Sequence, residues 1–270
     1  MTDEVLFECE GDCYLPTPLA GSPWHPALLH GGAPAALLAH CLEQSLSNGQ
    51  LKPTRLTIDL MRPVPRSPLS VSLRTLRQGK RIELHEATLM AAGKVVALAT
   101  GLFVLPQAIT VPAYAPLQNS TLPVPESLPD TSFKDVLFAG ALDLPPGLHT
   151  TVQLRAASPL CEQGQGKAWI SLPATIVRGQ DNSAFMLAAL VADFSNGIGQ
   201  LALGNNVGTI NADLSLQLLR LPESNWIGLD ARTLVQAEGI AMVQALMFDT
   251  KGLIGQVTQS AMPMGSAAGE

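Results

Sequence analysis

The sequence is poor in charged and aromatic residues, and both shortages limit what the protein can be. Charged residues make up 14% of the 270 residues and aromatic residues 4%, whereas apolar residues reach 47%. Such a composition supports a sizeable buried core. The net charge is −6, and Arg77, Lys80 and Arg81 form the main basic cluster. A nucleic-acid-binding surface needs a basic face, so we expect no nucleic-acid partner.

Cysteines and long apolar runs are also scarce. Only four cysteines occur, and no second Cys or His pair joins Cys9 and Cys13 in a zinc pattern. We therefore expect free thiols in a reducing compartment and no bound metal. Acidic residues at positions 3, 4, 8 and 10 are unlike a signal peptide, and no apolar run reaches the roughly 18 residues of a membrane span. These features predict a cytoplasmic protein without a membrane-spanning segment.

The most informative feature is a segment that occurs twice, 158 residues apart. The sequence RTLRQ at 74–78 returns as RTLVQ at 232–236, and Arg62 and Thr100 meet Arg220 and Thr258 at the same offset. A repeat this long is a whole folding unit and not a solenoid module of about 20–50 residues. It predicts a first copy at 1–105, a connector at 106–150 and a second copy at 151–270.

The first copy reads as a helix followed by strands. Residues 28–46 are apolar nearly all round, so this helix should be buried. Pro34 fits only the first helical turn, which places Gly31 and Gly32 at the start. Short turns separate four strand-like runs at 54–62, 69–78, 81–91 and 94–104, which predicts an antiparallel meander.

The second copy repeats this order after a proline-rich connector. The connector contains one expected short helix at 131–138. The second copy then has a strand at 167–176, a helix at 182–194, and strands at 208–219, 226–237, 240–249 and 252–262. An apolar helix beside an antiparallel sheet must be covered by that sheet. We expect the two sheets to join edge to edge, because pairing removes exposed strand edges.

This order resembles the hotdog fold, and its duplication resembles the double-hotdog acyl-CoA thioesterases, especially acyl-CoA thioesterase II and its relatives. The motifs that carry the resemblance are HGG at 30–32, RPVP at 62–65, RQGKR at 77–81, VADF at 191–194, NADLS at 211–215 and VTQ at 257–259. The resemblance implies an α+β double hotdog, with two antiparallel sheets each wrapped around a long central helix. It also implies an acyl-CoA substrate, with coenzyme A present only as part of that substrate.

In that family an Asp, a Thr and a Gln hold the hydrolytic water. The resemblance places the Asp at Asp193 and the Gln at Gln259, while the Thr position falls on Asn211. Thr209 lies two residues earlier on the same side of the strand and could substitute if the strand has a bulge. At the offset of 158 residues Gln259 corresponds to Gly101, so the Asp, Asn and Gln of the candidate site occur together in the second copy only. We expect one site per chain.

Two further groups are candidates for binding the substrate. The backbone N–H groups of Gly31 and Gly32, at the start of the first helix, could polarise the thioester carbonyl with help from the helix dipole. Arg77, Lys80 and Arg81 surround a hairpin turn and could bind the phosphates of coenzyme A.

Each candidate also has a structural interpretation. Asp193 is compatible with an ordinary helix end, and Gln259 and Asn211 with the solvent side of strands. Gly31 and Gly32 are compatible with close helix packing, and the basic cluster is compatible with a solvated turn. None of the five histidines is predicted to form the Asp–His pair typical of hotdog hydratases. A serine triad is also not supported, since no Gly-x-Ser-x-Gly motif occurs.

The combined prediction is a thioester hydrolase in which water is the nucleophile, without a metal and without a covalent intermediate. The alternative is a non-catalytic acyl-CoA or acyl-lipid binding protein with the same fold, which Asn211 in place of Thr favours. A third class, a structural assembly subunit, would show neither hydrolysis nor acyl-CoA binding. Double hotdogs of this kind are expected to form homo-oligomers.

Overall fold

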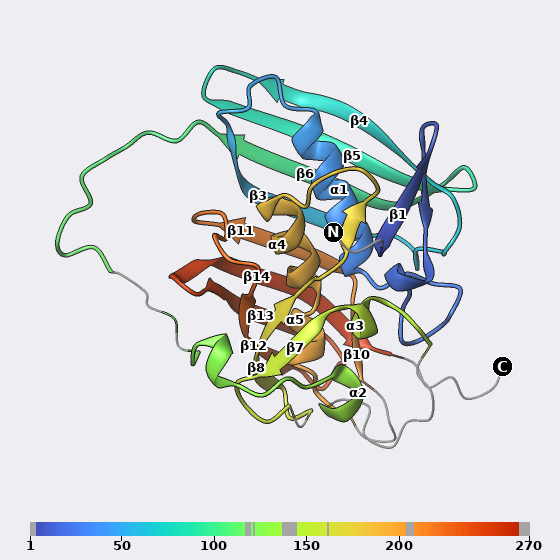
Figure 1. The fold of residues 1–270 in the computed structure, drawn as a ribbon, viewed down its shortest axis with the longest axis vertical. Coiled ribbons are helices and arrows are strands. Elements are labelled where there is room, and N and C mark those ends of the chain that lie inside the picture. The colour runs from blue at the N-terminus through green and yellow to red at the C-terminus, as the bar shows by residue number, and fades with distance from the viewer. Residues whose placement is uncertain are drawn as a thin grey trace.

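The computed structural model describes residues 4–116, 120, 122–136, 145–160, 162–203 and 208–264. Within these residues the strands form one sheet, in the order β7-β8-β12-β13-β14-β11-β3-β6-β5-β4-β2-β1-β9, with β10 paired to β14 (Figure 1). Strands of the first half are β1 (Val5–Glu10), β2 (Cys13–Pro16), β3 (Lys52–Leu60), β4 (Leu69–Gln78), β5 (Ile82–Ala91) and β6 (Lys94–Val104). Strands of the second half are β7 (Gln153–Ala156), β8 (Gln165–Ser171), β9 (Thr175–Val177), β10 (Thr209–Asn211), β11 (Asp213–Leu218), β12 (Ile227–Val235), β13 (Ala241–Asp249) and β14 (Gly252–Pro263).

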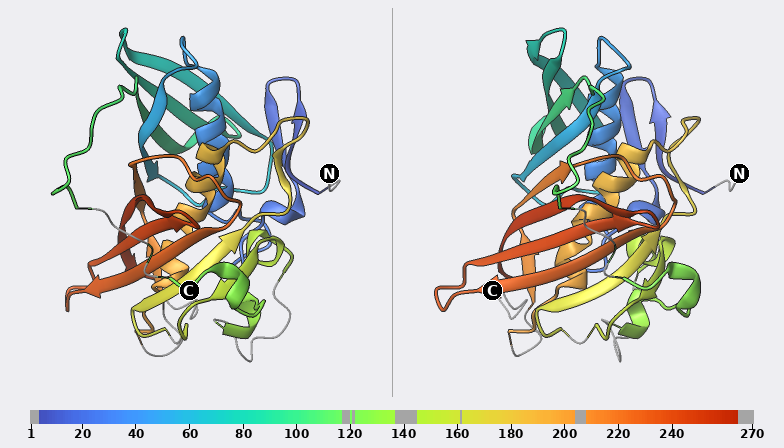
Figure 2. Two further views of the ribbon diagram at one scale, coloured as in Figure 1. Left: turned by 60° about the vertical axis from the view of Figure 1, so that its left-hand side comes forward. Right: turned by 90° about the vertical axis from the view of Figure 1, so that its left-hand side faces the viewer.

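Two helices, one from each copy, pack against each other beside this sheet (Figures 1 and 2). They are α1 (Gly32–Gln44) and α4 (Ala184–Asp193), and α1 is buried continuously from Gly32 to Leu42. Pro34 lies in the first turn of α1, as predicted. The remaining helices are short: α2 (Phe133–Val136), α3 (Leu148–Thr151) and α5 (Ser195–Ile198), with single 3₁₀ turns at Pro18–Ala20 and Pro125–Ser127.

The two copies join where β3 pairs with β11 in antiparallel register, with Leu56 opposite Leu216 and Ile58 opposite Leu214. The predicted edge-to-edge junction is therefore confirmed. The prediction of two sheets around two long helices is wrong, because this pairing makes one continuous sheet and the helices are only 13 and 10 residues long. One hydrophobic core spans both copies.

The strand order also corrects the predicted four-stranded meanders. In the first copy β4, β5 and β6 form a meander, but β3 pairs with β6, because residues 61–68 are long enough to carry the chain across. In the second copy β11 likewise pairs with β14. The strand predicted at 167–176 ends at Ser171, just before Pro173, which has no N–H for a sheet ladder. The chain resumes as β9, which pairs in parallel with β1 of the first copy.

Other predictions concern short segments. The predicted helix at 131–138 is α2, and its last two residues lie outside the described ones. The strand predicted at 208–219 is broken at Ala212 into β10 and β11. Cys9, Cys13 and Cys41 are free thiols, as predicted, and Cys161 lies outside the described residues. In the described part of the chain, no helix has both the length and the apolar character to cross a membrane.

Candidate active site

Helix α4 ends in a buried carboxylate. The Ser183 side chain caps the helix start by accepting a hydrogen bond of 3.1 Å from the Met186 N–H. The helix is otherwise almost entirely apolar, and its last residue, Asp193, keeps only 7% of its surface exposed. A carboxylate in such surroundings is costly unless other groups bind it, so its neighbours define the site.

Asp193 has one neighbour from each copy. The Asn211 side-chain amide, at the end of β10, donates to Asp193 Oδ1 at 3.1 Å. His30 Nδ1, just before α1, lies 3.1 Å from Asp193 Oδ2. The carboxylate thus joins the first copy to the second at the N-terminal end of α1.

Gly31 and Gly32 allow this close approach. A Cβ atom built on Gly31 would lie 2.6 Å from Asp193 Oδ1, and one on Gly32 would lie 2.7 Å from the Leu190 carbonyl oxygen. No side chain fits at these distances unless the neighbouring atoms move. These short distances confirm that the two glycines allow close packing. Their role in polarising a carbonyl stays a prediction. The Gly32 N–H lies 3.1 Å from His30 Nδ1.

The His30 ring is fixed by aromatic stacking. It stacks on Phe194 with centroids 4.4 Å apart, and Phe194 stacks on Phe133 at 5.2 Å. The prediction that no histidine forms an Asp–His pair is wrong, because His30 and Asp193 meet. The reason is topological: the two residues belong to different copies, and only the packing of α1 against α4 brings them together.

Gln259 lies on β14 with 1% of its surface exposed, and neither its amide oxygen nor its amide nitrogen has a hydrogen-bond partner among the described residues. Asn211 is opposite Ala261 on the neighbouring strand. Since side chains two residues apart share one face of a sheet, Gln259 and Asn211 project from the same face. The predicted solvent-facing alternative for Gln259 is wrong. The structure nevertheless places its amide outside hydrogen-bonding distance of Asp193.

Thr209 is not free to take the place of Asn211 in this arrangement. Its hydroxyl donates to Asn196 Oδ1 at 2.8 Å, and the Asn196 amide donates to the Thr209 carbonyl oxygen at 2.7 Å. These bonds attach β10 to α5, which begins two residues after Asp193. Asn211, and not Thr209, therefore contacts the carboxylate, and Thr209 holds the strand in place.

The connector adds a second histidine beside His30. His149, in α3, keeps 4% of its surface exposed, and its ring lies close to the Pro145 backbone carbonyl. Burial and, to a lesser extent, the nearby charge of His30 lower the pKa of His149 to about 4. Leu148 places α3 at the start of α1, because its N–H donates to the Gly21 carbonyl at 2.9 Å and its side chain lies against Gly32.

The basic cluster lies at the opposite end of α1. Arg77, Lys80 and Arg81 are exposed around the β4–β5 turn. Glu83, the second residue of β5, accepts hydrogen bonds from the Ser47 hydroxyl and backbone N–H just beyond the C-terminal end of α1. At 1.5 Å per residue, α1 separates this turn from Asp193 by about 20 Å. Binding of phosphates by these three residues stays a prediction.

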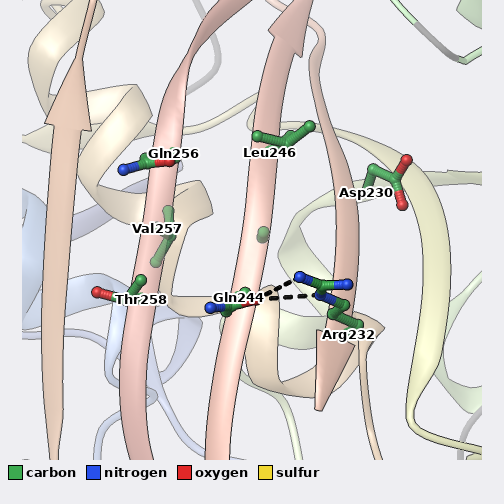
Figure 3. Close-up of a pocket in the computed structure, with 8 residues that line it drawn as sticks. Asp230, Arg232, Gln244, Leu246, Gln256, Val257 and Thr258 are labelled. Atoms are coloured by element: carbon green, nitrogen blue, oxygen red, sulfur yellow. Dashed lines mark hydrogen bonds between the residues drawn. The ribbon is translucent and has the colours of Figure 1, made fainter. Parts of the chain in front are cut away.

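A hollow on the other face of the sheet is separate from this site. It is lined by side chains of β12, β13 and β14, including Asp230, Arg232 and Thr258 (Figure 3). On β12, Asp230 and Arg232 alternate with the buried residues Leu229, Ala231 and Thr233. Gln259 faces the core, so the hollow lies on the opposite side of the sheet from the carboxylate.

Comparison with known proteins places this arrangement in a family context. The model of the acyl-CoA thioesterase N-terminal domain matches residues 20–104, and that of the acyl-CoA thioesterase C-terminal domain matches residues 124–262. Between them they contain His30, Asp193, Asn211 and Gln259. No curated protein matches the sequence significantly.

Solved structures share the fold at low sequence identity. A hot dog fold protein of unknown function from Alicyclobacillus acidocaldarius is 17% identical, with a TM-score of 0.71 over 97% of this chain and 96% of that one. The TesB protein of Mycobacterium avium is 17% identical, with a TM-score of 0.67 over 96% of each chain. An acyl-CoA thioesterase II from Mycobacterium marinum is 14% identical, with a TM-score of 0.63 over 97% of this chain and 96% of that one.

Proposed function

Because the chain belongs to the acyl-CoA thioesterase family, we propose that it hydrolyses acyl-CoA thioesters to the free acid and coenzyme A. The observation that carries the proposal is the buried Asp193 carboxylate, which Asn211 and His30 contact at the N-terminal end of α1. A thioester carbonyl needs an oriented nucleophile and a stabilised oxyanion. Side chains that could orient the nucleophile and N–H groups that could stabilise the oxyanion both lie within about one helical turn of this carboxylate.

In this proposal the nucleophile is a water molecule held by Asp193, Asn211 and Gln259. Each carboxylate oxygen has two lone pairs, so Asp193 can accept a hydrogen bond from water in addition to the bond from Asn211. The unpaired amide of Gln259 supports the proposal, because burying an unsatisfied amide costs about 1–3 kcal/mol. Such a cost is understandable where a ligand or substrate supplies the missing hydrogen bonds.

The carbonyl oxygen would lie at the N-terminal end of α1. There the Gly31 N–H has no acceptor among the described residues, and the positive end of the helix dipole favours a developing negative charge. The carbonyl carbon of a thioester bound at this position would lie near Asp193 and its water, because Gly31 carries no side chain. The geometry therefore allows the nucleophile and the oxyanion donors to act on one carbonyl group.

We further propose that Arg77, Lys80 and Arg81 bind the phosphates of coenzyme A. The pantetheine arm separates the thiol from these phosphates, which is compatible with the distance of about 20 Å along α1 between the turn and Asp193. Arg side chains suit phosphate groups because they donate two parallel hydrogen bonds. Replacing all three by Ala should raise KM for acyl-CoA and leave kcat close to wild type.

The experiment that tests the function is an assay of thiol release from acyl-CoAs of different chain length, with calorimetric binding measured in parallel. Hydrolysis predicts equal amounts of coenzyme A and free acid. The second candidate is a non-catalytic acyl-CoA binding protein, which Asn211 at the family's Thr position favours. It predicts saturable binding of acyl-CoA without thiol release.

A further inference from the structure

We infer that His30 is a further catalytic residue of this site, and that its Nε2 atom accepts the proton of the attacking water. The inference rests on the proposed thioester hydrolysis. It assigns Asp193 a second task, which is to hold His30 in the required tautomer. The general base would then come from the first copy and the residue that orients it from the second.

The surroundings of His30 Nδ1 determine the tautomer. This nitrogen lies 3.1 Å from Asp193 Oδ2 and 3.1 Å from the Gly32 N–H donor. One nitrogen either carries a proton and donates to the carboxylate, or carries a lone pair and accepts from Gly32. A hydrogen bond to an ionised partner is roughly twice as strong as a neutral one. The proton therefore resides on Nδ1, and the lone pair is left on Nε2.

The Nε2 atom is placed to use that lone pair. Among the described residues His30 makes its polar contacts through Nδ1 and none is found at Nε2, and the side chain keeps 15% of its surface exposed. Stacking on Phe194, which stacks in turn on Phe133, holds the ring plane. A general base needs this combination of a fixed orientation and an accessible lone pair.

Two titratable groups lie near His30. The Asp193 carboxylate, at the end of α4, lies 3.1 Å from its Nδ1 atom. His149 faces His30 from α3, but its pKa of about 4 keeps that ring uncharged at neutral pH. The connector therefore adds a buried imidazole next to His30 without adding a repelling positive charge.

The oxyanion donor at this site is the Gly31 N–H. It has no acceptor among the described residues, whereas the Gly32 N–H points at His30 Nδ1. The Gly31 N–H can therefore donate to the thioester carbonyl oxygen at the start of α1, next to the base.

The chemical steps balance without a further reactant. His30 Nε2 takes a proton from water as the water oxygen bonds to the carbonyl carbon, and the carbonyl π electrons move to the oxygen that the Gly31 amide binds. When these electrons return, the C–S bond breaks. The leaving thiolate takes the proton from His30, and the acid releases its own proton to solvent. The products are the free acid and the thiol.

Two His30 variants test this assignment. In His30→Asn the side-chain amide can still donate to Asp193, but no base remains. We expect kcat to fall by about 100-fold or more, within the 10²–10⁴ range of positioned general bases, with an unchanged melting temperature. In His30→Ala we expect added imidazole to restore part of the turnover, in proportion to its unprotonated fraction. His25→Ala, at an exposed histidine outside the site, is the matched control and should not respond to imidazole.

The possible results separate this inference from the proposed function. Wild-type turnover in both His30 variants would overturn the inference and leave the hydrolase function intact. Loss of turnover without any rescue by imidazole would assign His30 a structural role, which also overturns it. A wild-type protein that releases no thiol would overturn the proposed function, and this inference with it.

Discussion

His30 and Asp193 come from different copies of the repeat, yet their side chains lie 3.1 Å apart at the N-terminal end of α1. This contact exists only because α1 and α4 pack directly against each other and Gly31 leaves room for the carboxylate. The site therefore belongs to the interface between the copies and to neither copy alone.

Replacing Asp193 by Ala should remove most turnover. The expected loss is 10²–10⁴-fold, the range typical of positioned acid–base groups. The melting temperature should change little, because Ala suits a helix end and the desolvation cost of a buried carboxylate offsets most of its hydrogen bonding. Steady-state kinetics and thermal unfolding of the same preparation measure both effects. An Asp193→Ala protein with wild-type turnover would refute the role of the carboxylate.

Replacing Gln259 by Leu should raise the stability of the folded protein and lower its kcat. Removing a buried amide without partners relieves a cost of about 1–3 kcal/mol, while loss of the amide should lower kcat less than Asp193→Ala does. Gln217→Leu is the matched control, because the Gln217 side chain is exposed and accepts a hydrogen bond from the equally exposed Gln256; it should alter neither quantity. Lower stability in Gln259→Leu would show that the amide has partners inside the folded protein.

Gly31→Ala should reduce activity by displacing Asp193. The backbone of Gly31 is helical, with φ −56° and ψ −27°, so Ala is tolerated there, and any effect comes from its Cβ, 2.6 Å from Asp193 Oδ1. We expect at least a tenfold loss of kcat/KM. Gly49→Ala meets no atom within 4 Å and should retain full activity. Equal activity of the two variants would mean that the position of the carboxylate is unimportant.

The pair formed by Arg220 and Asp249 should govern stability at acid pH. Arg220 donates to both Asp249 oxygens, at 2.5 and 2.6 Å, and the N–H groups of Glu223 and Lys251 donate to them as well. Burial alone would raise the pKa of Asp249, but these bonds outweigh it and lower the pKa. A carboxyl whose pKa is lower in the folded state contributes stability above its ordinary pKa of about 3.9, and loses it as pH falls through the folded-state pKa.

The test of this pair is the melting temperature as a function of pH. Asp249→Ala should cost about 3 kcal/mol near neutral pH, because Arg220 loses its buried partner, and the difference from wild type should shrink as the pH drops below 4. Lys251→Ala removes an exposed ion pair with Glu223 and should cost less than about 1 kcal/mol. A constant difference between Asp249→Ala and wild type down to low pH would contradict the assignment.

Much of the fold could be predicted because equivalent residues of the two copies lie at equivalent positions of paired strands. Arg74 lies opposite Glu86 on β4 and β5, and Arg232 lies opposite Gln244 in the same register on β12 and β13. The placement of β3 and β9 could not be predicted. Both depend on which distant strand offers an unpaired edge, and local periodicity carries no information about that choice.

The candidate site could be predicted only in part. Asp193 and Asn211 were expected together and are hydrogen-bonded, whereas Thr209 bonds to Asn196 instead. His30 stood next to the predicted Gly31 and Gly32, but its contact with Asp193 is a tertiary one that spacing does not encode. His149 was missed because it lies in the proline-rich connector, where no periodic pattern marks the residues that turn back onto α1.

The most direct test of the account compares thiol release by the wild-type protein and by Asp193→Ala, with acyl-CoAs of short, medium and long chain. We expect the wild type to release coenzyme A and free acid in equal amounts from at least one of them, and the variant to bind the same substrate but turn it over at least 100-fold more slowly. Saturable binding of acyl-CoA by the wild type with no thiol release from any substrate would contradict it.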